Sequence, residues 1–218
     1  MFARACAGVR VGVRSLTSNE VGTKGRSNKM AIADAGGIVP LVDLATSGTV
    51  EQREAAVGAL WNLAFNDANK KAIAAAGGIP PLVDLVRNGT PRQKEQAASA
   101  LANLTVDEDN RSRVVGAGGI SALVPLMNGG ETERQRSFAH ACIRNLAIDA
   151  TIRQKIELAV SSGAETARSK ALVDACRKNV YLGDDAAAVE ERLEQLALGG
   201  GGENAPPADA AAKTVDVE

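Results

Sequence analysis

The sequence is poor in aromatic residues, in histidine and in net charge. Phe, Trp and Tyr make up 2% of its 218 residues, it has one histidine, and Lys and Arg (25) nearly balance Asp and Glu (26). A net charge of −1 gives no global reason to expect binding to nucleic acid or to an anionic membrane. With so few aromatic side chains, the core must consist of Ala, Leu, Val and Ile, which suits closely packed helices.

Long apolar runs and metal-binding patterns are also missing. No apolar run reaches the ~18–20 residues that a membrane-spanning helix needs. Cys6, Cys142 and Cys176 match no zinc spacing, and we interpret them as free thiols, which indicates a reducing compartment. The sequence contains no phosphate loop and no hydrolase, metalloprotease or kinase signature. We therefore expect no cofactor, no metal site and no catalytic residue.

Four markers recur along the chain at a constant spacing. An Ala-Gly-Gly-Ile segment occurs at 35–38, 76–79 and 117–120. An Asn followed by a basic residue precedes each segment, at 28–29, 69–70 and 110–111. A Thr follows it, at 49, 90 and 132, and then an Asn-Leu pair, at 62–63, 103–104 and 145–146. The third copy has one extra residue, in the loop between Leu126 and Thr132, so the phase of the helices is kept. The chain therefore contains a structural repeat with a period of about 41 residues.

Each repeat is predicted to form three helices, as the middle copy illustrates. A short first helix, Asn69–Ala76, opens on an Asn cap and ends at the Gly pair, because Gly adopts the left-handed conformation without a side-chain penalty. The second helix begins at Ile79 with prolines in its first turn, and Gly89 ends it. The third helix begins at Thr90, which is predicted to form a capping box with Gln93. Ala and Leu residues then form one buried stripe along it.

These features resemble armadillo repeats over residues 28–148. HEAT repeats are the nearest rival, but they have two helices and lack the Gly-Gly turn. The resemblance implies an all-α fold, a right-handed α-solenoid of three full armadillo repeats followed by a degenerate capping unit. The predicted boundaries are 28–68, 69–109 and 110–148 for the repeats and 149–198 for the capping unit. Within the family, the chain is most similar to general scaffolds such as the vacuolar and plant armadillo proteins.

The two ends of the chain lie outside this pattern. Residues 1–27 are predicted to be an unstructured leader, and residues 199–218, which begin with four glycines, a disordered tail. Residues 1–18 contain three arginines and no acidic residue, as a mitochondrial or plastid presequence does; otherwise we expect a cytoplasmic protein. No third helix precedes the first repeat. This favours either a fragment of a longer repeat protein or self-association or a partner that covers the uncapped end.

The resemblance implies a binding face on the third helices. In armadillo proteins these helices line a concave groove, and an Asn on each of them bonds to the backbone of an extended peptide, since a carboxamide offers both a donor and an acceptor. The matching residues are Asn62, Asn103 and Asn145. The alternative is that these side chains bond only within the repeats. The residues one turn earlier are small and are predicted to leave room for bulky partner side chains: Gly58, Ser99 and Ala141.

We therefore expect a non-catalytic scaffold for a protein or peptide partner. The family's nuclear-import adaptors carry Trp one turn before the Asn, where this chain has small residues, so an import adaptor fits less well; we interpret Trp61 as a packing residue. A substrate-recognition subunit of a ubiquitin-ligase assembly is an alternative, although no U-box or F-box pattern precedes the repeats. The last alternative is an enzyme that uses His140 or a cysteine. A nucleophilic pair of His140 with Cys142 is poorly supported, because residues two apart on a helix do not face each other.

Overall fold

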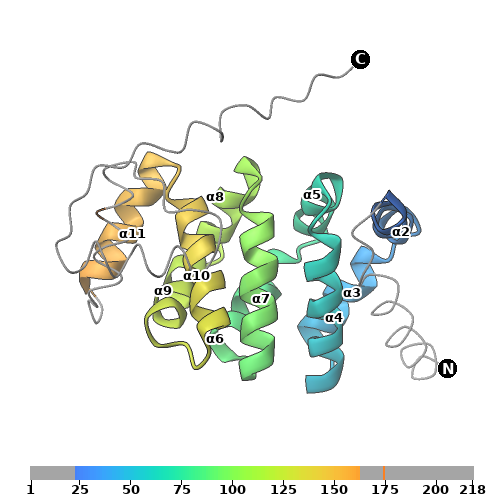
Figure 1. Ribbon diagram of the computed structural model, residues 1–218, viewed down its shortest axis with the longest axis horizontal. Helices are drawn as coiled ribbons and strands as arrows, with labels where there is room; N and C mark the ends of the chain where they lie inside the picture. The colour runs from blue at the N-terminus through green and yellow to red at the C-terminus, as the bar shows by residue number, and fades with distance from the viewer. Residues whose placement is uncertain (1–22, 163–173, 175–218) are drawn as a thin grey trace, which may run out of the picture.

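The computed structural model describes residues 23–162 and residue 174, and within that part of the chain every regular element is an α-helix (Figure 1). The helices in chain order are α2 (Thr23–Asp34), α3 (Ile38–Ser47), α4 (Val50–Leu63), α5 (Asp67–Ala75), α6 (Ile79–Asn88), α7 (Pro91–Leu104), α8 (Glu108–Gly116), α9 (Gly119–Gly129), α10 (Glu133–Leu146) and α11 (Ala150–Ser162). They form three successive groups of first, second and third helix, followed by α11. The predicted all-α solenoid is confirmed.

The third helices α4, α7 and α10 stand side by side in one layer, and α7 packs against both of its neighbours (Figure 1). Each third helix also packs against the second helix of its own repeat, in the pairs α3 with α4, α6 with α7 and α9 with α10. The first helices α5 and α8 lie at one end of this layer. One side of the third-helix layer is therefore packed, and the other side is not covered by any described helix.

The Gly-Gly pair forms the turn between the first and second helix of each repeat, as predicted. Its first glycine has a positive φ in all three copies, 76° at Gly36, 76° at Gly77 and 79° at Gly118, a conformation that disfavours any residue with a Cβ. The second glycine is needed for space. A Cβ at Gly119 would lie 2.5 Å from Cγ1 of Val114, on the helix that the turn has just ended.

The capping boxes at the start of the third helices are confirmed for Thr49, Thr90 and Thr132. Two of their glutamines have a further role that the sequence did not indicate. Gln93 Nε2 donates a hydrogen bond to the carbonyl of Val50 (2.8 Å), and Gln135 Nε2 donates to that of Pro91 (2.7 Å). Both carbonyls belong to the first turn of the preceding third helix. Each of these glutamines therefore caps its own helix and ties it to the neighbouring repeat.

The prediction that Asn69 caps the first helix of its repeat is wrong. The cap is Asn66, whose side chain accepts from the backbone N–H of Asn69. The Asn69 side chain is buried and donates to the carbonyls of Lys29 (3.1 Å), in the preceding repeat, and Leu63 (3.2 Å). Asn110 repeats this arrangement one unit later, with bonds to the carbonyls of Lys70 (3.4 Å) and Leu104 (3.2 Å) and with Asp107 as the cap. These asparagines join successive repeats.

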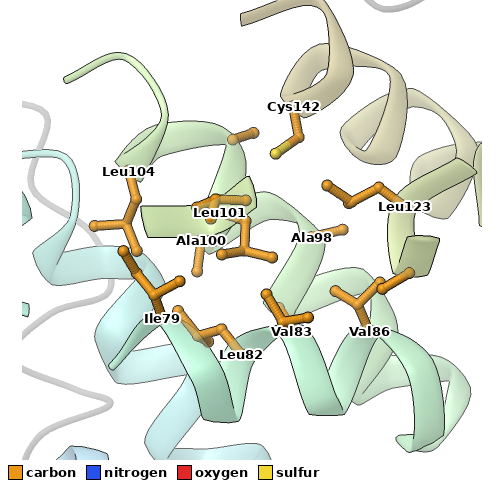
Figure 2. Packing of buried hydrophobic residues seen from close by; sticks show 14 of the residues in the cluster. Ile79, Leu82, Val83, Val86, Ala98, Ala100, Leu101, Leu104, Leu123 and Cys142 are labelled. Atoms are coloured by element: carbon orange, nitrogen blue, oxygen red, sulfur yellow. The ribbon is translucent and has the colours of Figure 1, made fainter. Parts of the chain in front are cut away.

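The core runs through all three repeats and consists mainly of Ala, Leu, Val and Ile, as the scarcity of aromatics predicted. Figure 2 shows the part where α7 packs on α6, α9 and α10. The predicted stripe of α7 is fully buried: Ala97, Ala100, Leu101 and Leu104 are each 0% exposed. Small residues on α7 let its neighbours approach closely, while leucines from both sides fill the remaining space.

The ends of the solenoid differ in part from the sequence prediction. Helix α2 begins at Thr23, so the last five residues of the predicted 1–27 leader are helical. Helix α11 packs against α9 and α10 and takes the place of a first helix in the fourth unit. The rest of the predicted leader and capping unit, the tail, Cys6 and Cys176 lie outside the described residues.

No single described helix is long and apolar enough to cross a membrane. Two segments, Asn28–Asp34 and Ile38–Ser47, reach the necessary length and composition only as a pair, and they are bent by 81° relative to each other.

Candidate functional site

The uncovered side of α4, α7 and α10 carries seven register positions that repeat from helix to helix, and we call this surface the third-helix face. Its residues recur at helical spacings of three and four, which places them on one side of each helix. They are Glu51, Glu54, Ala55, Gly58, Trp61, Asn62 and Phe65; Arg92, Glu95, Gln96, Ser99, Ala102, Asn103 and Val106; and Arg134, Ser137, Phe138, Ala141, Arg144, Asn145 and Ile148. All are at least partly exposed except two, Ser99 and Ala102, which lie on the middle helix.

The predicted asparagine row lies on this face, but its members are not equivalent. Asn145 Nδ2 donates to the carbonyl of Ala102 (3.0 Å) and to Oγ1 of Thr105 (3.4 Å), so its amide is bound to the preceding third helix. Asn103 Nδ2 is buried and has no hydrogen-bond partner. Asn62 is half-buried at the same register position of α4. The row therefore combines an amide with a structural bond and an amide with an unused donor.

The small residues one turn earlier do not leave the open groove that the sequence suggested. At Gly58, a Cβ would lie 3.1 Å from Nε2 of Gln96, because this side chain of the next helix lies over the glycine. Ser99 is 3% exposed. Ala141 is half-buried. At Gly58, a side chain of the neighbouring helix thus occupies the space that the small residue provides.

Three of the five aromatic residues of the chain meet on the third-helix face. The Trp61 ring lies 6.4 Å from that of Phe138 (interplanar angle 60°) and 6.4 Å from that of Phe65 (43°). Trp61 belongs to α4 and Phe138 to α10, and α7 stands between these two helices (Figure 1). The two rings therefore meet across α7. Trp61 also packs against the core, in agreement with its interpretation as a packing residue.

A row of exposed apolar side chains follows the asparagines, and the sequence analysis did not identify it. Phe65, Val106 and Ile148 are 57%, 59% and 64% exposed and lie three residues after Asn62, Asn103 and Asn145. Lys29 Nζ lies 5.0 Å from the centre of the Phe65 ring. The signal was available: the second residue after the end of each third helix is a large apolar residue in all three copies, although polar residues are common at such exposed helix ends.

The charges at the other end of the third helices are paired between repeats. Arg92 lies 2.9 Å from Glu54, and Arg134 lies 3.7 Å from Glu95. Both pairs are partly exposed, so each contributes little to stability. Their effect on the face is that opposite charges compensate each other. On each third helix, the third to sixth of the seven register positions carry no acidic side chain. Across all three helices, they carry one basic side chain, Arg144.

The residues of the enzyme alternative are buried in the core. His140 is 4% exposed and Cys142 is 0% exposed. Burial raises the pKa of the Cys142 thiol to about 12, although the contact with Oγ1 of Thr105 (3.8 Å) acts in the opposite direction. The thiol is therefore protonated and inaccessible at neutral pH, whereas a nucleophilic cysteine needs an exposed thiolate. Within residues 23–162, moreover, no group of His, Cys, Asp and Glu side chains could hold a metal ion.

The comparisons with known proteins agree with this geometry. The family model for the Armadillo/beta-catenin-like repeat matches residues 25–65 and 66–106. An engineered protein of known crystal structure is 26% identical, with a TM-score of 0.67 over 90% of this chain and 92% of the other. A designed armadillo repeat protein solved in complex with the peptide (KR)4 is 21% identical, with a TM-score of 0.68 over 89% of this chain and 84% of the other.

A computationally designed armadillo repeat protein for modular peptide recognition is 20% identical and has a TM-score of 0.66, over 88% of this chain and 92% of the other. No curated protein matches the sequence. Residues 25–106 therefore contain two armadillo repeats, the third copy follows them in register, and the described part of the chain has the fold of armadillo repeat proteins.

Proposed function

We propose that this protein is a non-catalytic scaffold that binds an extended segment of a partner protein along the third-helix face. The observation that carries the proposal is the row of Asn62, Asn103 and Asn145 at one register position of three adjacent helices, with the Nδ2 donor of Asn103 buried and unpaired. A buried donor without an acceptor is unfavourable. A peptide carbonyl placed against it removes that penalty.

The spacing of the helices fits an extended chain. Packed helices lie about 8–10 Å apart, and a strand advances about 3.3 Å per residue, so roughly three residues of a partner correspond to one repeat. A segment of about nine residues then passes all three asparagines. The designed armadillo repeat protein that was solved in complex with (KR)4 supports a peptide as the kind of partner.

The test is selection from a phage-displayed library of random dodecapeptides with the full chain as bait. Enriched peptides are then titrated against the wild type and against the Asn62→Ala, Asn103→Ala, Asn145→Ala triple variant. If each amide contributes a bond or two, the triple variant should bind about 30- to 1,000-fold more weakly.

The matched control is Asn88→Ala, which removes an exposed amide from α6, away from the face, and should bind as the wild type does. Melting temperatures show that each variant is folded. Equal affinities of the wild type and a folded triple variant would contradict the proposal and leave the asparagines with a structural role only.

A further inference from the structure

We infer that the centre of the third-helix face is a covered subsite, in which Trp61 and Phe138 close over Ser99 and separate when an uncharged partner segment inserts an apolar side chain between them. This inference rests on the proposed function and specifies which partner the face accepts. Its basis is the combination of burial, ring contacts and unpaired polar atoms around the middle third helix.

The burial pattern locates the cover. Ser99 and Ala102 are 3% and 9% exposed, whereas the equivalent residues on α4 and α10 are all partly exposed. Trp61 occupies on α4 the position that Ala102 occupies on α7, and Phe138 occupies on α10 the position that Gln96 occupies on α7. A contact between these two rings therefore crosses α7 between those two levels, where Ser99 lies. We attribute the burial of Ser99 to these two rings.

Two polar atoms without partners lie on either side of this cover. Gln96 Oε1 and Asn103 Nδ2 are both buried and have no hydrogen-bond partner, and they belong to residues three before and four after Ser99. The first is an acceptor and the second a donor. Seven residues of helix correspond to about 10 Å along α7, roughly twice the 4.8 Å between a strand and its hydrogen-bonding neighbour, so an extended segment that crosses α7 at Ser99 lies between the two atoms. A backbone that crosses Ser99 thus offers an N–H to one atom and a C=O to the other.

The surroundings define the chemistry of the inserted side chain. The walls are the aromatic rings of Trp61 and Phe138, and the floor is the small side chain of Ser99. The acidic side chains of the face, Glu54 and Glu95 among them, lie toward the other end of the helices, where these two already pair with arginines. Among the described residues of this face, no carboxylate lies at the subsite to hold a partner's lysine or arginine. An aromatic or branched apolar residue fits the subsite.

The cover can open without disrupting the fold. An aromatic pair contributes only modestly beyond its buried area, so a partner ring that replaces one contact compensates for most of the loss. Phe65 contacts Trp61 from its other side and remains available to it. The apparent affinity for a partner is then reduced by the fraction of molecules in which the cover is closed.

The test uses the dodecapeptides selected on the full chain. The sequence has one Trp, so tryptophan emission, excited selectively over that of Tyr181, reports on Trp61 when the peptide itself contains no Trp. Peptides that bind should carry an aromatic or branched apolar residue. Their binding should change the Trp61 emission, and the peptide concentration at half of this change should agree with the Kd measured by calorimetry. Replacing the apolar residue of the peptide by Ala should abolish the change.

A second variant fills the subsite. Ser99→Leu places a bulky side chain on its floor and should weaken binding about 5- to 150-fold, because overpacking opposes the inserted group. Ser112→Leu makes the same substitution at an exposed position of α8 and should leave the affinity unchanged. If Ser99→Leu does not fold, the emission of the wild type decides the question alone.

The outcomes separate the inference from the proposed function. If peptides bind through the asparagines but leave the Trp61 emission unchanged, or bind folded Ser99→Leu as tightly as the wild type, the covered subsite is refuted and the scaffold function remains. If no selected peptide prefers the wild type over the triple asparagine variant, the proposed function fails, and the subsite fails with it.

Discussion

Two rows of asparagines run along this solenoid, and the same side chain is used differently in each. In the inner row, Asn69 and Asn110 are 2% exposed, and each donates two hydrogen bonds to carbonyls, one of them in the preceding repeat. In the outer row, Asn145 is bonded to the preceding third helix, while the Nδ2 atom of Asn103 has no partner. Both described members of the inner row use their donors within the array, whereas the outer row includes one donor, Nδ2 of Asn103, without a partner.

The difference shows that a repeated residue is not by itself evidence of function. Both rows keep a spacing of 41 or 42 residues, and both follow from the same three-helix unit. What separates them is where the donors point and whether an acceptor is already there. A buried donor that lacks an acceptor on a surface layer is a candidate for binding, and a donor with two acceptors inside the array is a structural group.

The largest effect is expected from the inner row. Asn69→Ala removes one buried and one partly buried hydrogen bond and leaves the carbonyls of Leu63 and Lys29 without these donors. We expect a loss of about 2–4 kcal/mol in the free energy of unfolding, measured by guanidinium denaturation followed by circular dichroism at 222 nm. Asn69→Asp, which keeps the size but loses the donors, should be at least as damaging. A change below about 0.5 kcal/mol in Asn69→Ala would show that the inner row is dispensable.

The sequence could predict much of the fold because the signals are local. The Gly-Gly turn depends on a positive φ, the third helix on a capping box, and the buried stripe on helical spacing, and each lies within a few residues of chain. The cap of the first helix was misassigned for the same reason. Asn66 and Asn69 are both good cap residues, and only the packing of the preceding repeat shows which one is buried.

The site could be predicted only in outline. Register placed Asn62, Asn103 and Asn145 in one row, but it does not tell which amide already has a partner. The contact between Trp61 and Phe138 joins helices two repeats apart, and it depends on the small side chains of the helix between them. Their separation of 77 residues carries no local signal. The burial of Ser99 was not predicted either.

A smaller effect is expected from the bonded member of the outer row. Asn145→Ala removes the bonds to the Ala102 carbonyl and to Thr105, but the residue is only half-buried, so water can replace part of what is lost. We expect a loss of about 0.5–1.5 kcal/mol in the same denaturation experiment. A loss as large as that of Asn69→Ala would mean that the two rows do not differ in kind.

The smallest effect on stability, and the sharpest contrast, is expected for Asn103→Ala. The substitution removes a buried donor that has no partner and introduces a better helix former in α7. The free energy of unfolding should therefore stay within about 0.5 kcal/mol of the wild type or rise by up to about 1 kcal/mol.

Peptide affinity should change in the other direction. Loss of the hydrogen bond that Asn103 offers to a partner should weaken binding of a selected peptide by about 2- to 10-fold. Denaturation and titration on the same preparation measure both quantities. Asn145→Ala is the comparison, because we expect it to lose stability, whereas Asn103→Ala should keep or gain it. A variant that gains stability and loses affinity identifies Asn103 as a residue kept for binding, since stability alone does not favour an unpaired amide there. If Asn103→Ala is instead destabilised like Asn145→Ala and binds peptide normally, the donor has a structural partner, and the distinction between the two rows disappears.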